Sequence, residues 1–187
     1  MNTTKSFGPF LRSAHLYLRE VRLSDVEGNY HRWMNDPEVT RYLESRFRPH
    51  SADSLREYIV ARQKDQQTLF LAIVLENGDR HIGNIKLGPI DWIHRVGDIG
   101  ILIGEKDCWG KGYAREAITA LARFAFDTLN LHRLTASCYA VNEGSARTFQ
   151  SVGFSIEGVR RGHYFCAGGW VDAVLLGLLR DELVSGP

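Results

Sequence analysis

Hydrophobic positions in the first half of the chain gather in three short segments. Residues 16–21 read Leu-Tyr-Leu-Arg-Glu-Val, and residues 68–75 and 81–87 are rich in apolar side chains, several of them β-branched. Such segments are typical of strands buried on one or both faces. Asn77-Gly78 stands between the last two and tolerates the positive φ angles of a tight turn. The pattern predicts one strand followed by a β-hairpin.

Helical signals separate the first strand from this hairpin. Ser24 is followed three residues later by Glu27, the arrangement of a capping box, which predicts a helix that runs to about Trp33. Ser51 or Asp53 can cap a second helix, which ends before the hairpin begins. The sequence therefore predicts strand, two helices and a hairpin, in that order.

The second half of the chain alternates strand and helix signals. After Gly112 apolar side chains recur at helical spacing up to Leu129, and Asn142 can cap another helix that ends at Gly153. Further strands are predicted over residues 96–103, 132–139, 154–165 and 170–179, the last two around a Gly168-Gly169 turn. Hairpins come first and β-α-β units later. The order predicts a mixed sheet, parallel near the strands at Val96 and His132, with helices on both faces.

Composition places the chain among ordinary globular proteins. Its 187 residues are 44% hydrophobic and 24% charged, which excludes a disordered or collagen-like chain. We expect a single domain over residues 14–183, preceded by an N-terminal tail over residues 1–13. Lys and Arg number 23 against 22 Asp and Glu, a formal net charge of +1. This balance argues against nucleic acid as a partner, because that interaction needs clustered excess basic residues.

Membrane and metal signals are absent from the sequence. The longest apolar run, residues 69–75, is far shorter than the roughly 20 residues of a membrane span, and no signal-peptide segment begins the sequence. We therefore expect a cytoplasmic protein without membrane contact. The three cysteines show no CxxC spacing and the seven histidines no HExxH pattern, so we assign no metal.

The segment from Gly104 to Glu116 carries the clearest chemistry. A predicted strand leads into Gly110-Lys111-Gly112 and an amphipathic helix leaves it, so backbone N–H groups and the positive end of the helix are directed at one place. Such a place binds a phosphate. A dinucleotide-binding GxGxxG would need glycine at Arg115. A Walker loop fails because Gly104 is one residue too far from Gly110 and Gly112 replaces the Mg²⁺-binding hydroxyl.

These residues resemble the GNAT-type N-acetyltransferases. The signature of that family is Gln/Arg-x-x-Gly-x-Gly/Ala at the start of a helix that binds the pyrophosphate of acetyl-CoA, and it falls here on residues 107–112. Asp107 departs from it, since Gln or Arg is usual. Residues 109–117 are most similar to the subgroup of ribosomal-protein N-terminal acetyltransferases and related small-molecule enzymes, and Asn142-x-x-Ser145 with Gly153-Phe154 resembles its second element. The similarity covers about residues 16–180.

The resemblance implies a fold and a cofactor. The fold is an α/β (α+β) one, with a mixed, mostly antiparallel twisted sheet of about six to seven strands flanked by about four helices. The cofactor is acetyl-CoA, a co-substrate, whose pantetheine arm would pair with the strand at residues 96–103. The residues expected to bind it are Leu102, Ile103, Trp109, Gly110, Lys111, Gly112, Tyr113, Ala114, Arg115, Asn142 and Ser145.

Acetyl transfer to an amine also needs a proton acceptor and a proton donor. Asp98 is the first candidate for the base, with His94 and Glu105 as alternatives, although bulk water can also take the proton. Many relatives carry a tyrosine seven residues after the asparagine, but this chain has Phe149 there. Ser145 is therefore expected to stabilise the departing thiolate. A solvent-facing strand residue is an equal interpretation of Asp98, and a residue of the helix cap is the alternative for Ser145.

The acceptor is expected to be a primary amine of a small molecule, such as an amino sugar, or a protein N-terminus. Arg41, Tyr42, Glu44 and Arg46 are the candidate contacts, although a solvated run of charges is the favoured interpretation of this segment, and no substrate is assigned from it alone. Asp107 and Phe149 keep open a non-catalytic module that binds acyl-CoA in a regulatory role. A homodimer is a further possibility.

Overall fold

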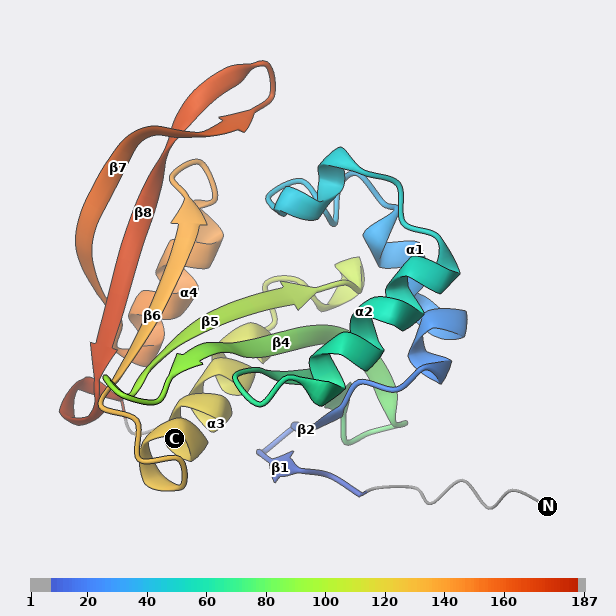
Figure 1. The fold of residues 1–187 in the computed structure, drawn as a ribbon, viewed down its shortest axis with the longest axis horizontal. Coiled ribbons are helices and arrows are strands. Elements are labelled where there is room, and N and C mark those ends of the chain that lie inside the picture. The colour runs from blue at the N-terminus through green and yellow to red at the C-terminus, as the bar shows by residue number, and fades with distance from the viewer. Residues whose placement is uncertain (1–7, 185–187) are drawn as a thin grey trace.

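The computed structural model describes residues 8–184 and contains a single eight-stranded sheet (Figure 1). Its order is β1-β2-β3-β4-β5-β6-β8-β7, and only β5 and β6 run parallel. The strands are β1 (Leu11–Arg12), β2 (Leu16–Glu20), β3 (Leu69–Leu75), β4 (Arg80–Asp91), β5 (Val96–Ile103), β6 (Arg133–Tyr139), β7 (Ser155–Cys166) and β8 (Gly169–Leu179). The mixed, mostly antiparallel sheet of the sequence prediction is confirmed.

The eighth strand is β1, which the hydrophobic pattern did not predict. Its two residues are too few to show a periodicity, and they pair with Tyr17 and Leu18 of β2. It belongs to the stretch expected to form a tail over residues 1–13, of which residues 1–7 lie outside the described part of the chain.

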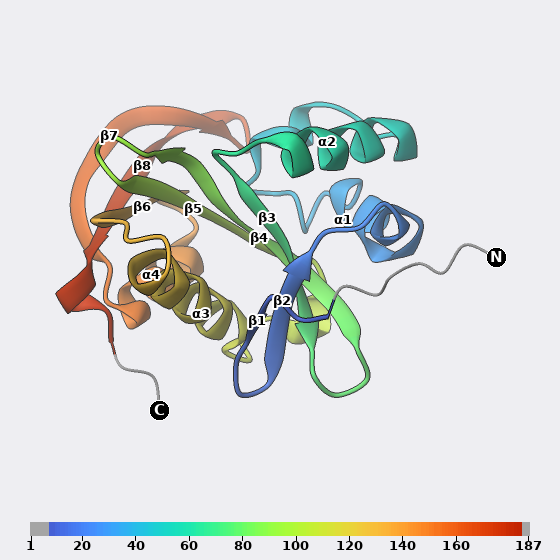
Figure 2. The ribbon, with the colours of Figure 1, turned by 60° about the horizontal axis from the view of Figure 1, so that its bottom comes forward.

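In the described part of the chain, four α-helices cover the two faces of the sheet (Figure 2). They are α1 (His31–Met34), α2 (Ala52–Lys64), α3 (Tyr113–Asp127) and α4 (Glu143–Val152). Leu121 and Phe126 of α3 belong to the larger core cluster on one face, while Trp33 and Ile59 belong to the cluster under α1 and α2. No helix within residues 8–184 combines the length and the apolar character that crossing a membrane requires.

The helix predicted from Ser24 to Trp33 is interrupted. Val26–Tyr30 forms a π-helical turn in which Gly28 has non-helical angles (φ −87°, ψ −122°), and only His31–Met34 is α-helical. The capping residue is Asp25, and its carboxylate accepts hydrogen bonds from Arg19 at 2.7 and 2.8 Å and from the Arg22 backbone at 2.7 Å. An ion pair with β2 therefore replaces the capping box.

Other predicted turns and caps lie close to their expected places. The Ser51 hydroxyl accepts a hydrogen bond from the Ser54 backbone at 3.1 Å and begins α2. Gly78 has a φ of +82° in the turn between β3 and β4. The turn between β7 and β8 uses Ala167 (φ +51°) and Gly168 (φ +82°), one residue earlier than predicted.

The functional geometry comes from the separation of β5 and β6. These strands pair only where Val96, Gly97 and Asp98 face Arg133, Leu134 and Thr135. Beyond this point they diverge, and Figure 1 shows β5 and β6 running apart toward their C-terminal ends. The long β7–β8 hairpin continues beyond β6, and the segment between α1 and α2 lies across the opening from it. We call the space between the diverging strands the β5–β6 opening.

Candidate active site

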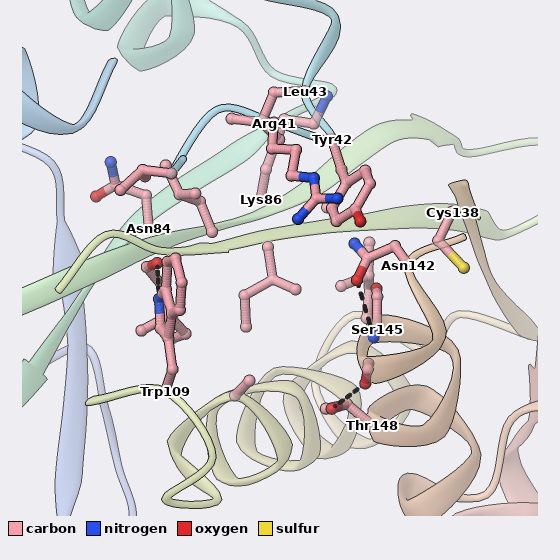
Figure 3. A pocket seen from close by; sticks show the side chains of 18 of the residues that line it. Arg41, Tyr42, Leu43, Asn84, Lys86, Trp109, Cys138, Asn142, Ser145 and Thr148 are labelled. Carbon is pink, nitrogen blue, oxygen red and sulfur yellow. Dashed lines mark hydrogen bonds between the residues drawn. The ribbon is translucent and has the colours of Figure 1, made fainter. Parts of the chain in front are cut away.

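A cavity of about 1290 Å³ occupies the β5–β6 opening and extends under the segment between α1 and α2. Its walls come from parts of the chain that are far apart in sequence: the start of α3, the edge of β5, the start of α4, the segment before α2, and β4. Figure 3 shows the side chains of Trp109, Asn142 and Ser145 on one side of β5, and those of Arg41 and Tyr42 on the other. We call this space the central cavity.

The loop before α3 provides unpaired backbone donors at one end of the central cavity. Gly110 and Gly112 have φ angles of +72° and +83°, a conformation that other residues rarely adopt, and a Cβ atom at either would meet nothing within 4 Å. The first backbone bond of α3 runs from Glu116 N–H to Gly112 O, so the N–H groups of Tyr113, Ala114 and Arg115 precede the intrahelical ladder. This end of the helix has the geometry and the positive dipole of an anion site.

Most of the predicted cofactor-binding loop lines the central cavity. Trp109, Gly110, Gly112, Tyr113, Ala114 and Arg115 are among the lining residues, and Lys111 is not. The Trp109 indole donates a hydrogen bond to the Ile103 carbonyl at 2.8 Å, which holds the loop against the end of β5. Leu102 and Ile103 line the cavity as well.

The edge of β5 that faces the opening has the properties that a paired pantetheine arm requires. Within residues 8–184, β6 pairs with β5 only as far as Asp98. Residues 99–103 therefore present an open strand edge to the central cavity, and all five of them line it. An extended chain with amide groups can pair with such an edge as an additional strand does.

Asp107, the departure from the family signature, is held by an arginine. Arg80 donates two hydrogen bonds to this carboxylate at 2.7 Å each, and they hold the pKa of Asp107 below its usual range. The pair lies outside the lining of the central cavity. Asp107 is therefore neutralised from outside the cavity and does not direct its charge into the phosphate site.

Glu105, a predicted alternative base, joins the loop to α1. Its side chain accepts hydrogen bonds from the Trp33 indole at 2.8 Å and from Arg80 at 2.6 Å, and it also pairs with Arg32. Burial favours protonation of this carboxyl, but these donors outweigh it, so the pKa of Glu105 is lowered. Gly104 allows the contact, since a Cβ atom there would lie 2.0 Å from the Trp33 ring.

The start of α4 forms the opposite wall. The Asn142 side chain accepts a hydrogen bond from the Ser145 backbone at 3.4 Å and caps the helix. Both residues line the cavity, and so does Phe149, which is buried in the core. Cys138 on β6 is a neighbour that the sequence did not single out. Burial raises the pKa of its thiol, and a hydrogen bond with Ser145 opposes that shift.

Asp98, the first candidate for the base, does not line the central cavity. It lies at the closed end of the opening, where it pairs with Thr135, and the Thr135 hydroxyl donates a hydrogen bond to its carboxylate at 3.0 Å. Burial raises the pKa of Asp98 above its ordinary value, although the Thr135 bond and the charge of Lys86 oppose this shift. His94, the other alternative, is exposed and is not a lining residue.

Of the predicted acceptor residues, Arg41, Tyr42 and Glu44 line the central cavity and Arg46 does not. The Arg46 guanidinium donates hydrogen bonds to the Tyr139 hydroxyl at 2.9 Å and to the Phe165 carbonyl at 2.5 Å. Arg46 thereby connects the segment before α2 to β6 and to the β7–β8 hairpin. Tyr42, Tyr139 and Tyr164 form a row of aromatic rings at the same junction, with centroids 5.8 and 4.1 Å apart.

Two polar residues of β4 were missed by the sequence analysis. Asn84 and Lys86 line the central cavity on the side of α1 and α2 (Figure 3). They interrupt an otherwise apolar strand at alternating positions, and this was the signal that was available in the sequence. Among the residues that the structure describes, no group of three or more His, Cys, Asp or Glu is placed to hold a metal ion.

Comparisons with known proteins show which family this chain is similar to. A family model described as an acetyltransferase (GNAT) domain matches residues 15–155. The N-acetyltransferase p20 of Bacillus licheniformis, which is named as uncharacterized, is 30% identical over 92% of this chain and 97% of its own. YdaF of Bacillus subtilis, whose name proposes a ribosomal N-acetyltransferase, is 33% identical over 79% and 81%. The crystal structure of spermidine N-acetyltransferase from Vibrio cholerae, in complex with CoA and spermine, superposes with a TM-score of 0.81 at 25% identity, covering 91% of this chain and 98% of that one.

Proposed function

The chain belongs to the GNAT acetyltransferase family and is an acetyl-CoA-dependent N-acetyltransferase, and we propose that its central cavity joins acetyl-CoA to a primary amine of a small molecule. The observation that carries the proposal is the continuity of this cavity. It extends from the glycine loop before α3, along the open edge of β5, to Arg41 and Tyr42 before α2. Acetyl-CoA and the amine acceptor can therefore bind in the same cavity.

The residues present fit acetyl-CoA. The N–H groups that begin α3 would receive the pyrophosphate, and the glycines leave room for it to approach the backbone. The open edge of β5 at residues 99–103 would pair with the amide groups of the pantetheine arm. The thioester would then lie in the opening between β5 and the start of α4.

Ser145 is our candidate for stabilising the thiolate that leaves. Its hydroxyl lies at the start of α4, where the positive end of the helix also favours a negative charge. Phe149 has no proton to donate, although it lines the same wall. Asn142 would act by capping the helix and thereby holding Ser145 in place.

The amine must lose a proton before it attacks the thioester. We propose Asp98 for this role through intervening water, because it lies beyond the cavity wall. Its raised pKa makes it a better proton acceptor than an exposed carboxylate. The positive charge of Lys86, which lines the acceptor side of the cavity, acts to lower the pKa of Asp98. The protonation of the proposed base is therefore coupled to a residue on the acceptor side.

The acceptor would enter from the side of α1 and α2. The contact from Arg46 to Phe165 joins the segment before α2 to the β7–β8 hairpin on this side of the cavity. A side closed in this way would favour a small molecule over a folded protein. The name of the Vibrio cholerae structure, a spermidine N-acetyltransferase, supports the same class of acceptor. A protein N-terminus remains the second candidate, because an extended peptide end is thin enough for the same path.

Thiol release from acetyl-CoA tests the proposal. Purified protein is incubated with acetyl-CoA and, one at a time, with amino sugars, amino acids, polyamines and short peptides that have free N-termini. We expect turnover with a small amine, and binding of acetyl-CoA measured by calorimetry without any amine. Turnover with peptides alone would overturn the small-molecule proposal, and failure to bind acetyl-CoA would overturn the assignment of the cavity.

A further inference from the structure

Gly100, in the middle of β5, occupies a position where the fold does not require a glycine. Its φ angle lies outside the positive range that favours glycine. Within residues 8–184, and apart from its chain neighbours, the nearest atom to a Cβ placed there is Lys86 Cε at 4.0 Å, an ordinary van der Waals distance. The pairing of β4 with β5 is regular on both sides of the Lys86–Gly100 pair. An alanine would therefore fit at Gly100 without a change in the backbone.

Other glycines of the sheet are required by close neighbours. A Cβ atom at Gly83 would lie 2.2 Å from the Leu102 carbonyl oxygen. One at Gly97 would lie 2.7 Å from Leu87 Cδ1. Glycine weakens a strand because it loses more conformational freedom on folding than other residues do, and within a strand it often marks a place where a ligand approaches the backbone. The bare backbone at Gly100 is therefore better explained by a ligand than by packing.

The missing side chain leaves a recess on the face of the sheet that lies under α1 and α2. Successive residues of a strand alternate between the two faces. Ile99 and Ile101 pack in the cluster with α3, whereas Leu102 packs against the cluster under α1 and α2. Gly100 therefore faces the same side as Leu102, and it lines the central cavity. We call the space above it the Gly100 recess.

Larger side chains of the same face bound the Gly100 recess. Lys86 pairs with Gly100 across β4 and β5, and Phe70 pairs with Lys86 across β3 and β4. Residues that pair directly across antiparallel strands share a face, and all three of these line the central cavity. From β3 to β5 this row therefore consists of phenylalanine, lysine and glycine. The layer of side chains is thinnest at β5, beside the β5–β6 opening.

The Gly100 recess lies beside the place proposed for the thioester. The pantetheine arm would pair with the open edge of β5 at residues 99–103, and paired strands are about 4.8 Å apart. Side chains point away from the plane of a sheet, so a Cβ atom at Gly100 would not occupy the edge itself. An amine in the recess is within about one strand spacing of the arm. From there it can reach the separation of about 3–3.5 Å at which attack takes place.

The recess is also next to the proposed base. Asp98 precedes Gly100 by two residues on the same face of β5, so the two lie roughly 6.5 Å apart along the strand. A single water molecule with two hydrogen bonds of about 2.8 Å spans most of this separation. The distance agrees with the route through water from the amine to Asp98.

We infer that Gly100 forms the binding recess for the reacting amine, and that the carbon carrying this amine rests against the bare backbone of β5. This inference rests on the proposed function. Even one methyl group at Gly100 would displace the amine by on the order of 1 Å, and a displacement of this size can reduce the rate about a hundredfold. Gly100 thus determines which part of the acceptor can approach the thioester.

The recess is separate from the contacts expected for acetyl-CoA. The cofactor would use the backbone N–H groups at the start of α3 and the edge of β5, whereas the recess opens on the face of the sheet. A substitution that fills the recess should therefore reduce the use of the acceptor and leave the affinity for acetyl-CoA unchanged. This difference provides an internal control.

Gly100→Ala tests the inference by adding one Cβ atom. We expect kcat/KM for the acceptor to fall at least tenfold, while the dissociation constant of acetyl-CoA, measured by calorimetry, stays within about twofold of the wild type. Gly158→Ala on β7 is the matched control, because its added Cβ atom would also lie 4.0 Å from the nearest neighbour, Leu175 Cδ1, and it is outside the cavity lining. This control should keep the kcat/KM of the wild type.

The melting temperature separates a role in binding from a role in folding. Alanine loses less conformational freedom on folding than glycine, so neither variant should melt at a lower temperature than the wild type. A melting temperature several degrees lower in Gly100→Ala than in Gly158→Ala would show that the fold needs this glycine. The inference would then be overturned.

The kinetic outcomes separate this inference from the proposed function. If the wild type acetylates a small amine and Gly100→Ala does so with the same kcat/KM, the inference is overturned and the proposed function stands. An equal loss of acetyl-CoA affinity would assign the recess to the cofactor and would also overturn the inference. If the wild type acetylates peptides alone, the proposed function fails. A tenfold loss with peptides in Gly100→Ala would then still support the recess as the site of the amine.

Discussion

Substitutions at Gly112 can separate the effect of backbone geometry on acetyl-CoA binding from the effect of charge. Its φ of +83° favours glycine, and asparagine and aspartate are the side chains that tolerate this region best. We predict that Gly112→Asp weakens acetyl-CoA binding more than tenfold, because a carboxylate then faces the pyrophosphate. Calorimetry measures the dissociation constant, and tenfold corresponds to about 1.4 kcal/mol.

Gly112→Asn is the matched control, because it has nearly the same size and no charge. Its dissociation constant for acetyl-CoA should be lower than that of Gly112→Asp by most of the predicted tenfold change. Both variants should remain folded, since aspartate and asparagine are good residues at the start of a helix. Equal loss in the two variants would show that bulk or backbone strain is the cause, and the electrostatic account would be wrong.

Substitution of Ser145 can separate an effect on catalysis from an effect on acetyl-CoA binding. We predict that Ser145→Ala lowers kcat by about tenfold or more and changes the dissociation constant of acetyl-CoA little, because the hydroxyl acts on charge that develops as the thiolate leaves. Steady-state kinetics with a saturating acceptor measure it. Ser151→Ala removes a hydroxyl from the same helix, whose bond is to the Thr148 carbonyl, and should leave kcat unchanged. An unaltered kcat in Ser145→Ala would remove this residue from the mechanism.

Residues whose role depends on local backbone could be predicted from the sequence. Gly110, Gly112 and Asn142 are of this kind, because a glycine pair before an amphipathic helix and a capping asparagine act within a few residues. Asn84 interrupts the apolar pattern of its strand, but its unpaired donor could not be predicted, because that donor arises only when the fold places the side-chain oxygen against His81. That property depends on packing and has no sequence signature.

Among the elements, the loop before α3 depends on a buried carboxylate. Glu105 receives hydrogen bonds from Trp33 of α1 and from Arg80 of β4, so one side chain joins three elements. The pKa of Glu105 is lowered from its ordinary 4.5 in the folded protein. Its ionised form therefore contributes stability above pH 4.5, and this contribution is lost as the pH falls through the lower folded pKa.

We predict that Glu105→Gln lowers the free energy of unfolding by about 1.5–3 kcal/mol at pH 7, the range for hydrogen bonds to a charged group. The difference from the wild type should shrink as the pH falls below about 4.5. Urea unfolding at pH 7 and at pH 3.5 measures both quantities. Glu143→Gln, whose pair with Arg147 is exposed on α4, is the control and should cost less than about 0.5 kcal/mol. If the difference in unfolding free energy between Glu105→Gln and the wild type were the same at pH 7 and pH 3.5, the stabilising role of the ionised Glu105 would be contradicted.

The interrupted helix after Ser24 shows where local signals fail at the scale of elements. Ser24 and Glu27 have the spacing of a capping box, yet Asp25 at the helix start is bound to Arg19 of β2. A buried ion pair with bidentate geometry outweighs a cap worth about 1 kcal/mol. The long helices α2, α3 and α4 were predicted correctly because their periodicity or capping is sustained over ten or more residues.

For the whole molecule, strand order was predictable where neighbours in sequence are neighbours in the sheet. The hairpins and the parallel β5–β6 pair follow from the order of strands and helices. The extent of the β5–β6 pairing was not predictable, because nothing in residues 96–103 indicates that β6 departs after Asp98. The contact between the segment before α2 and the β7–β8 hairpin was equally hidden, since 119 residues separate Arg46 from Phe165.

This long-range contact makes Arg46 a positioning residue for the acceptor side of the whole molecule. Its guanidinium donates to the Leu43 carbonyl at 2.8 Å as well as to Tyr139 and Phe165. The planar guanidinium has five N–H donors in a fixed arrangement and can serve all three acceptors at once. Arg41 and Tyr42 precede it by a few residues, so their placement in the central cavity depends on this junction.

We predict that Arg46→Met raises the acceptor KM several-fold, because segment 41–48 is released from the β7–β8 hairpin, while the acetyl-CoA affinity stays the same. The free energy of unfolding should fall by only about 1–3 kcal/mol, because the contacts lie near the surface. Steady-state kinetics and calorimetry measure the two affinities. Arg48→Met is the control, since Arg48 is exposed and its described contact is made by its backbone. Equal losses of acceptor and acetyl-CoA affinity would indicate general unfolding, and an unchanged acceptor KM would show that the junction does not position the acceptor.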